Sequence, residues 1–266
     1  RKRLIEINEL AAMWFNHILT NATQGAAGRA LIEDRKVSPE SVQNWKLGFA
    51  PESWDALLNF MASRNYQAAE VAEAGLASER DGGGYYDRFR NRLMFPIRDG
   101  DGNTVGFGGR ALGDAQPKYL NTAQTLIFDK SRLLYGLDLA KNAIRESDQV
   151  VIVEGYMDAI ATHEFGYKNV VASMGTALTD AQVDLIKRGN PQIVLALDAD
   201  AAGQMAMMRG LQTMTDNLSD EMVPTLSADR VLGFERKLKA DIRIVQLDGG
   251  KDPDDIVRSE PESWPR

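Results

Sequence analysis

Three carboxylates directly follow two short apolar segments, where they could hold a divalent cation. Glu154 follows the first segment, and Asp198 and Asp200 follow the second. Asp158 lies four residues beyond Glu154, in the first turn of a predicted helix. Residues two apart in an extended segment point to one face, so Asp198 and Asp200 would act together. Any single one of these residues suits a helix N-cap equally well, but the set at consecutive strand ends favours a metal site.

The residue types of this set indicate which cation it would bind. Like charges at one edge repel each other unless a cation lies among them, and Asp and Glu oxygens suit hard cations such as Mg²⁺ or Mn²⁺. The chain has no cysteine, which excludes disulfides and thiolate metal ligands. Its two histidines, His17 and His163, lie far apart in helical patterns. We therefore expect more than one Mg²⁺ or Mn²⁺ ion to bind and no zinc.

The elements that must position these carboxylates alternate between strand and helix. Apolar, β-branched runs predict strands at residues 149–153, 169–172 and 192–197, and helical patterns lie between them at residues 159–165 and 179–188. This spacing predicts an α/β fold with a doubly wound parallel sheet. In such sheets ligands bind beyond the carboxyl ends of the strands, where Glu154, Asp198 and Asp200 are expected.

Two motifs in this stretch resemble a known signature. Glu154-Gly-Tyr-Met-Asp158 and Asp198-Ala-Asp200-Ala-Ala-Gly203 are similar to the motifs of the Toprim domain. That domain is shared by bacterial-type primases, topoisomerases and some nucleases. The two motifs do not choose among these classes, so the flanking sequence must decide.

The charge of the chain is unevenly distributed. The net charge of the 266 residues is −7, which by itself disfavours a nucleic-acid partner. Residues 80–132, however, contain nine Arg or Lys against six Asp and no Glu, a local charge of +3, so the remainder carries −10. Arg88, Arg90 and Arg92 alternate and would line one face of a strand. A basic surface beside an acidic pocket fits a protein that binds a phosphate backbone.

Further motifs in the same region make the resemblance specific. They look like the consecutive motifs of the bacterial replicative DNA primase family and occur in the family's order, at residues 86–97, 106–110, 117–121, 128–130 and 134–136. The match covers roughly residues 1–258. It implies the RNA polymerase domain of a primase, which makes RNA primers on single-stranded DNA for replication and acts as a DNA-directed RNA polymerase.

The resemblance also implies roles for individual residues. The segment Lys251-Asp-Pro-Asp254 corresponds to further metal-site carboxylates, carried over here to Asp252 and Asp254. Glu154 would bind metal or act as a base, and Asp158, Asp198 and Asp200 would serve the metal site and catalysis. The residues that would face the template and nucleotides are Arg110, Lys118, Asn121 and Lys130, with Arg88, Arg90 and Arg92 extending the groove.

The same reasoning divides the chain into parts. We expect a mixed α+β nucleic-acid-binding module at residues 1–132, a Toprim catalytic domain at 133–258 and a truncated tail at 259–266. The family also has a zinc-binding domain and a helicase-binding region, and neither is recognisable here, so we expect a fragment. No apolar run is long enough to span a membrane and no signal peptide is visible, which favours a cytoplasmic protein of a bacterial or phage-infected cell.

Two other classes of function remain open on the residues alone. One is a Toprim-type nuclease or topoisomerase fragment, although no tyrosine lies in a recognisable nucleophile context. The other is a non-catalytic nucleic-acid-binding module, which would gain nothing from concentrated negative charge. For the primase, the expected partners are single-stranded DNA, NTPs and an RNA primer. A replicative helicase would be contacted through a region outside this sequence.

Segments outside the predicted parallel sheet also carry signals of local structure. Residues 1–30 predict a helix that Gly25 and Gly28 weaken or end, and Asp99-Gly-Asp-Gly-Asn103 predicts a hairpin turn. Trp45, Phe49 and Trp54 could stack on bases, but their apolar neighbours favour the core. Residues 204–217 predict a helix, and residues 218–239 predict a helical or irregular excursion to which we assign no function.

Overall fold

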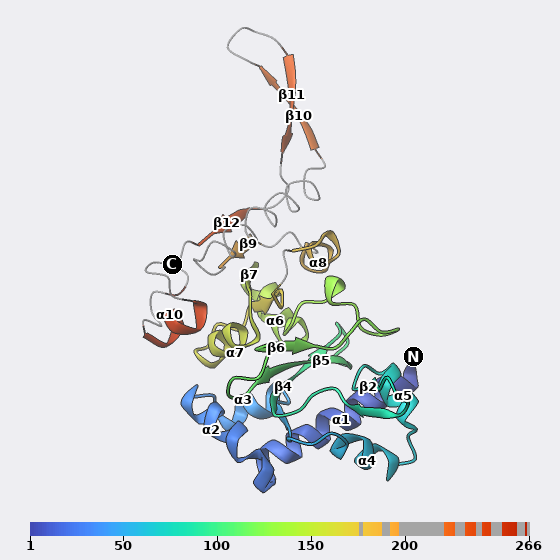
Figure 1. The fold of residues 1–266 in the computed structure, drawn as a ribbon. Coiled ribbons are helices and arrows are strands. Elements are labelled where there is room, and N and C mark those ends of the chain that lie inside the picture. The colour runs from blue at the N-terminus through green and yellow to red at the C-terminus, as the bar shows by residue number, and fades with distance from the viewer. Residues whose placement is uncertain are drawn as a thin grey trace. The chain divides into compact units, whose positions relative to one another are not determined.

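The chain forms two compact units, Arg1–Lys130 and Ser131–Arg266 (Figure 1). The computed structural model describes residues 1–175, 178–187, 192–196, 221–226, 232–237, 241–245, 252–259 and 264. No helix in these ranges is long and apolar enough to cross a lipid bilayer.

The N-terminal unit is built on a four-stranded antiparallel sheet with the order β1-β4-β5-β6. Its strands are β1 (Gly48–Ala50), β4 (Arg92–Arg98), β5 (Thr104–Ala111) and β6 (Tyr119–Asn121). The predicted hairpin turn joins β4 to β5, with a bulge between Ile97 and Arg98. Asp99 closes this turn because its Oδ1 accepts the backbone N–H groups of Asp101 and Asn103, each at 3.0 Å.

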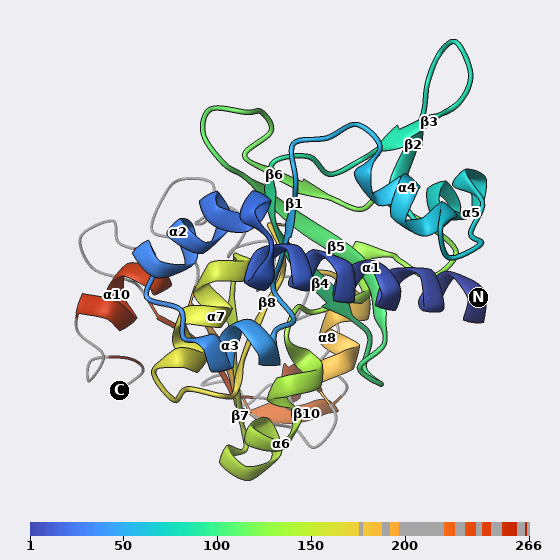
Figure 2. The same ribbon diagram turned by 90° about the horizontal axis from the view of Figure 1, so that it is seen from below.

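Helices cover one face of this sheet (Figure 2). They are α1 (Lys2–Asn21), the short turn η1 (Thr23–Gly25), α2 (Ala26–Asp34) and α3 (Pro39–Asn44). The periodic apolar residues of α1, among them Ile7, Ala11 and Phe15, are buried. A Cβ on Gly25 would lie 2.1 Å from the Ile18 carbonyl oxygen, so the close approach there requires glycine. The helix expected over residues 1–30 is interrupted before Gly25, since α1 ends at Asn21, whereas Gly28 does not end a helix but lies inside α2.

Glu9 connects α1 to the sheet. Its Oε1 accepts the backbone N–H of Thr104 at 2.6 Å, and its Oε2 accepts from Lys46 Nζ at 3.0 Å. Burial alone would raise the pKa of Glu9, but the hydrogen bonds from Thr104 and Lys46 hold it below its usual value. These hydrogen bonds therefore stabilise the ionised form of Glu9.

A smaller subdomain extends from the same unit. It consists of α4 (Ala56–Ala62), α5 (Ala68–Glu73) and a two-stranded ribbon of β2 (Ala77–Glu79) and β3 (Tyr85–Asp87). Asp55 occupies the N-cap position of α4, but its side chain makes no cap hydrogen bond. The side chain of Asp87 caps α4 instead. Its Oδ2 accepts from Leu57 N, 30 residues earlier, at 2.7 Å, and its Oδ1 accepts from Leu58 N at 3.0 Å. The carboxylate of Asp87 thus fixes the ribbon to the start of α4.

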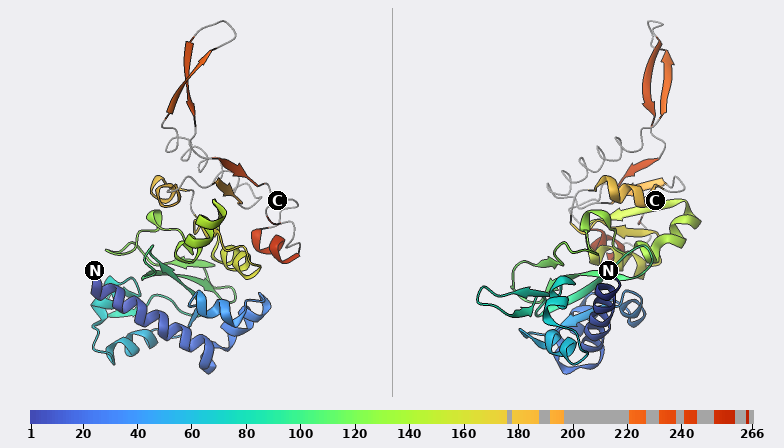
Figure 3. Two further views of the ribbon diagram at one scale, coloured as in Figure 1. Left: turned by 180° about the vertical axis from the view of Figure 1, so that it is seen from behind. Right: turned by 90° about the vertical axis from the view of Figure 1, so that its right-hand side faces the viewer.

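The C-terminal unit contains the predicted parallel sheet, with the order β12-β9-β7-β8 (Figure 3). Its strands are β7 (Gln149–Val153), β8 (Val170–Ala172), β9 (Gln192–Leu195) and β12 (Ile242–Ile244), and every pair is parallel. β7 lies in the middle, with β8 and β9 on its two sides. The α/β fold with a parallel sheet is confirmed.

Helices pack against this sheet at alternating residues of its strands. They are α6 (Leu137–Ser147), α7 (Tyr156–Glu164) and α8 (Asp180–Ile186), while α10 (Pro253–Ser259) packs against α7. Val150 and Ile152 of β7 share one apolar cluster with Ala140 of α6 and Val183 of α8. α7 contacts β8 and lies beside α10. Residues 204–217, predicted as a helix, lie outside the described residues.

One sequence prediction for this unit is wrong. Residues 218–239 were expected to be helical or irregular, but two strands occur there, β10 (Glu221–Leu226) and β11 (Leu232–Lys237). They pair antiparallel, from Glu221 opposite Lys237 to Leu226 opposite Leu232. The pairing of two nearby segments supplies the backbone hydrogen bonds that a helix would otherwise have to make.

His163 gives this unit a pH dependence. Its side chain is 3% exposed, Nε2 lies 2.9 Å from the Val170 carbonyl oxygen, and burial lowers its pKa from 6.5 to about 4. Between pH 6.5 and 4 the imidazole of His163 is therefore protonated in the unfolded chain but still neutral in the folded chain. The free energy of unfolding is at its full value above pH 6.5 and decreases as the pH falls through this range. Lowering the pH from 7.5 to 5 should therefore reduce the free energy of unfolding by about 2 kcal/mol through His163 alone.

The measurement is urea denaturation at pH 7.5 and pH 5 for three proteins. His163→Gln should reduce the loss of unfolding free energy by about 2 kcal/mol, because glutamine does not titrate. His17→Gln, which changes the exposed histidine of α1, is the matched control and should behave like the parent. Equal pH dependence in all three proteins would contradict the prediction.

Candidate functional site

Glu154 lies at the carboxyl end of β7, where the sequence places it. Its backbone carbonyl accepts the N–H of Gly175 at 3.1 Å, which joins the end of β7 to the segment after β8. The next residue, Gly155, is the N-cap of α7. A Cβ at Gly155 would lie 2.9 Å from Asp158 Oδ2, so the tight turn from strand to helix needs glycine to let the carboxylate of Asp158 approach.

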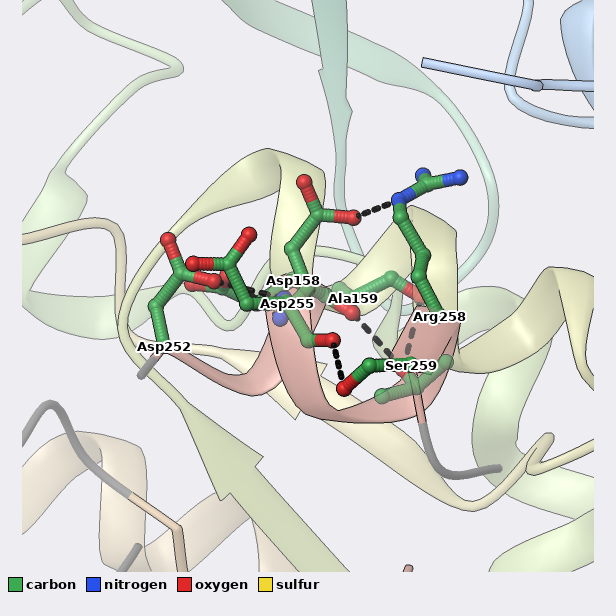
Figure 4. Close-up of polar contacts among 8 residues, drawn as sticks. Asp158, Ala159, Asp252, Asp255, Arg258 and Ser259 are labelled. Carbon is green, nitrogen blue, oxygen red and sulfur yellow. Dashed lines mark hydrogen bonds and ion pairs between the residues drawn. The ribbon is translucent and has the colours of Figure 1, made fainter. Parts of the chain in front are cut away.

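Asp158 and Asp254 meet although 96 residues separate them. Asp158 is buried in the first turn of α7, and its Oδ2 accepts from Gly155 N at 2.9 Å. Its Oδ1 accepts from the backbone N–H of Asp254, in the first turn of α10, at 3.4 Å. Asp254 is 1% exposed, and its Oδ1 accepts from Arg258 Nε at 2.5 Å. Figure 4 labels Asp158 of α7 and Arg258 of α10 in this cluster.

Asp252 lies at the beginning of the same helix and is partly exposed. Its Oδ1 accepts the backbone N–H of Asp255 at 2.7 Å, so Asp252 caps α10. Asp255 is exposed in the first turn. The structure thus brings Asp158, Asp252 and Asp254 to two adjacent helix starts, and the helix of Asp158 follows the carboxyl end of β7 in sequence.

Asp198 and Asp200 lie outside the described residues, after the last described residue of the β9 segment, Ala196. Within the described ranges, no group of three or more His, Cys, Asp or Glu side chains is arranged to hold a metal ion. The available donors, Glu154, Asp158, Asp252 and Asp254, are all carboxylates, which fits the oxygen preference of Mg²⁺ and Mn²⁺.

The N-terminal unit contains a basic hollow with a volume of about 450 Å³. Three arginines line it together with Trp54, Tyr86 and Pro117; they are Arg88, Arg90 and Arg92. The guanidinium carbon of Arg90 lies 4.0 Å from the centre of the Trp54 ring and 5.2 Å from that of Tyr86. Cationic groups beside exposed aromatic faces can contact both the phosphates and the bases of a single strand.

The arginines reach this hollow differently from the way the sequence predicted. Residues 87–92 do not form one strand: β3 ends at Asp87, β4 begins at Arg92, and Asn91 between them has a φ of 49°. Arg88 Nη2 donates to the Asn121 carbonyl at 3.1 Å, while its Nε is buried and finds no partner in the described part of the chain. Burial lowers the pKa of Arg88, so a negatively charged ligand would stabilise its cationic form.

Arg92 is the most buried of the three and holds a loop in place. Its Nη1 donates to the carbonyl oxygens of Gly109 and Pro117 at 3.2 and 2.9 Å. Burial, followed by the nearby charge of Arg90, lowers its pKa. Arg92 therefore shapes the wall of the hollow from the strand side.

The remaining predicted basic residues lie along β5, β6 and the following segment. Arg110 is on β5, opposite Tyr119 on β6, and its Nε and Nη1 are buried without a partner among the described residues. Asn121 ends β6, and Lys118 is exposed just before that strand. Lys130 begins the short turn η2 (Lys130–Arg132), and burial lowers the pKa of its ammonium group.

Sequence reasoning missed the aromatic wall of the hollow. Trp45 and Phe49 are buried, as expected, but the core assignment of Trp54 is wrong, because its side chain is 58% exposed. Its immediate neighbours, Ser53 and Asp55, are polar, and this was the available signal. Trp54 and Tyr86 join the candidate site as stacking surfaces for bases or arginines.

Comparisons with known proteins match both parts of the chain. Residues 14–141 match the family described as DNA primase catalytic core, N-terminal domain, and residues 148–221 match the Toprim domain. The DNA primase of Halalkalibacterium halodurans is 40% identical over 256 residues, which are 96% of this chain and 39% of that protein. The chain therefore spans about two fifths of the length of such relatives.

Solved structures give the same result. A crystal structure of a DNA primase domain from Pseudomonas aeruginosa has a TM-score of 0.85 at 37% identity, covering 97% of this chain and 75% of that one. The structure of a DnaG primase catalytic domain bound to single-stranded DNA has a TM-score of 0.83 at 34% identity, covering 98% and 78%.

Proposed function

Because the chain belongs to the DnaG-type DNA primases as a catalytic core with a Toprim domain, we propose that it synthesises RNA primers on single-stranded DNA. The 3′-hydroxyl of the growing primer attacks the α-phosphate of an incoming nucleotide, and pyrophosphate leaves. The observation that carries this proposal is the meeting of Asp158 and Asp254 at the starts of α7 and α10, of which α7 follows directly after β7 and Glu154. It supports a shared acidic site assembled from distant parts of the chain.

A Toprim domain implies the use of a divalent cation. The residues that would hold it are Glu154, Asp198, Asp200, Asp252 and Asp254, with Asp158 contributing to the same acidic site. When bound, Mg²⁺ or Mn²⁺ supplies neutralisation of phosphate charge and a lower pKa of the attacking hydroxyl. Glu154, which is only partly buried, serves as a ligand or accepts the proton of that hydroxyl.

The N-terminal unit would bind the template and nucleotide phosphates. Phosphoryl transfer depends mainly on positioning and charge stabilisation, and the basic residues supply both. Arg90 and Trp54 offer a cation and an aromatic face in one hollow, which suits a single strand whose bases are unpaired. Arg110 has buried N–H groups without a partner in the described ranges, and an anionic oxygen would satisfy them.

Incubation with single-stranded DNA, Mg²⁺ or Mn²⁺ and labelled NTPs tests this function. A primase makes template-dependent RNA, a Toprim nuclease or topoisomerase fragment cuts the template, and a binding module only retains it. RNA product that requires both template and divalent cation is the expected result. Cleavage or retention without RNA would reject the proposal in favour of the corresponding alternative.

The basic residues should contribute separately to DNA binding. We expect Lys118→Ala and Arg110→Ala each to weaken binding of single-stranded DNA and to reduce the slope of log K against log salt concentration by about 0.7, the value for one phosphate contact. Fluorescence anisotropy at several salt concentrations measures both quantities. Lys2→Ala, which removes an exposed cation from α1, is the control. Unchanged affinity and slope in both variants would place the groove elsewhere.

A further inference from the structure

α10 is too short to be stable by itself, so neighbouring groups must hold it in place. It has seven residues, and isolated helices below about 12 residues are marginal in water. We propose that Asp158 and Arg258 are positioning residues that clasp α10 against α7 and so place Asp252 and Asp254 for the divalent cation. The inference depends on the proposed function only for the identity of that cation site.

The first half of the clasp is the carboxylate of Asp158. One oxygen accepts Gly155 N, at the start of its own helix, and the other accepts Asp254 N, at the start of α10. The first N–H groups of a helix have no partner within the helix, so one buried side chain caps two helices at once. This geometry directs both oxygens of Asp158 towards backbone groups, which is the arrangement of a helix cap.

The second half of the clasp is Arg258. A carboxylate as buried as that of Asp254 needs a compensating charge, and Arg258 supplies it from one turn later in α10, through Nε at 2.5 Å. Its Nη1 and Nη2 are also buried and have no partner within the described residues. In Figure 4 these two nitrogens point away from the carboxylates, so the contact visible for Arg258 is the one that fixes Asp254.

The consequence for the cation site follows from the spacing of the residues. Asp252 and Asp254 flank Pro253, the first residue of α10, and Asp252 caps that helix through Asp255 N. Any displacement of α10 relative to α7 therefore moves both carboxylates together. Groups that orient metal ligands without touching the metal typically change metal affinity by about 10- to 100-fold.

A clasp and a direct ligand predict opposite effects in metal-free buffer. If Asp158 were mainly a ligand, removing its charge would relieve repulsion among the carboxylates and leave the fold unchanged or more stable. If Asp158 is a clasp, the same change releases α10 and lowers the melting temperature. The sign of the stability change in EDTA therefore separates the two roles, and it does not depend on enzymatic activity.

The experiment uses the full chain and the variants Asp158→Asn, Arg258→Met and Arg258→Lys. Thermal unfolding and hydrogen exchange of residues 252–259 are measured in EDTA, and Mn²⁺ binding is measured by electron paramagnetic resonance. We expect Asp158→Asn and Arg258→Met to lower the melting temperature by roughly 5 °C. We also expect faster exchange in α10 and Mn²⁺ affinity weaker by about 10-fold or more. Arg258→Lys should recover part of each effect, because it restores the charge.

Asp255→Asn is the matched control, because Asp255 belongs to the same helix but its side chain is exposed; it should leave all three readouts near the parent values. An unchanged or higher melting temperature for Asp158→Asn in EDTA, together with lost Mn²⁺ binding, would make Asp158 a ligand and overturn the inference. Unchanged α10 exchange in both Arg258 variants would also overturn it. Failure of the proposed function would appear separately, as wild-type protein that makes no RNA.

Discussion

Asp198→Ala and Asp200→Ala are each expected to reduce nucleotide addition by on the order of 10²- to 10³-fold, the usual cost of losing one preorganised charge-stabilising group. Both residues follow the β9 segment, whose strand is hydrogen-bonded to β7, the strand that precedes Glu154. Loss of either carboxylate would weaken the hold on the cation that neutralises the phosphates. In metal-free buffer the same variants should melt at the same or a higher temperature, because a like charge has been removed.

Primer extension with labelled NTPs, alongside circular dichroism, measures both effects. Asp184→Asn is the control: it removes an exposed carboxylate of α8 that pairs with Lys187 on the surface, and such pairs contribute little. Near-normal polymerisation by either variant would show that the carboxylate it lacks is not part of the metal site. Lost activity with a collapsed fold would instead assign that residue a structural role.

Asp87→Ala is expected to destabilise the N-terminal unit by about 3 kcal/mol, because it leaves two helix N–H groups without their charged partner. Asp87 is buried, and its two oxygens hold Leu57 N and Leu58 N. Burial raises the pKa of this carboxyl, and those two hydrogen bonds offset the rise only in part. Asp87→Asn keeps one acceptor and the same size, so it should cost less.

Denaturation at pH 7 gives the free energies, and Asp55→Ala provides the comparison. Asp55 occupies the N-cap position but does not cap α4, so its loss should change the stability by less than about 0.5 kcal/mol. A larger cost for Asp55→Ala than for Asp87→Ala would contradict the assigned cap. Weaker DNA binding by Asp87→Ala is also expected, because the ribbon loses its side-chain anchor on α4, and the same ribbon holds the Trp54 carbonyl through the backbone N–H of residue 87 at 2.7 Å beside the basic hollow.

The parallel sheet could be predicted from the sequence because its information is local. Each buried strand is a short β-branched run, and the helices between them have the spacing that right-handed crossovers require. The position of Glu154 at a strand end followed from the same pattern. The hairpin turn at Asp99 was also predictable, since its Asp and Gly residues make the turn by themselves.

Contacts between distant residues could not be predicted in this way. Asp87 caps a helix whose Leu57 lies 30 residues earlier, although Asp55 occupies the N-cap position. The hydrogen bond from Asp254 to Asp158 likewise depends on how two helices pack. Trp54 was assigned to the core on its apolar surroundings, although the polar Ser53 and Asp55 directly beside it indicate a loop at the surface. Such features depend on tertiary packing, which a single sequence does not specify directly.

The contact between α7 and α10 also determines when the acidic site can form during protein synthesis. Asp158 precedes its partner Asp254 by 96 residues, which a ribosome adds in roughly 5 to 20 s at about 5–20 residues per second. Throughout that interval the nascent chain carries β7 and the start of α7 but not the helix that completes the cluster. If Asp252 and Asp254 hold the proposed cation, the unit becomes competent for cation binding only after translation of α10, and a ribosome stalled before Asp252 would display a nascent chain without that site.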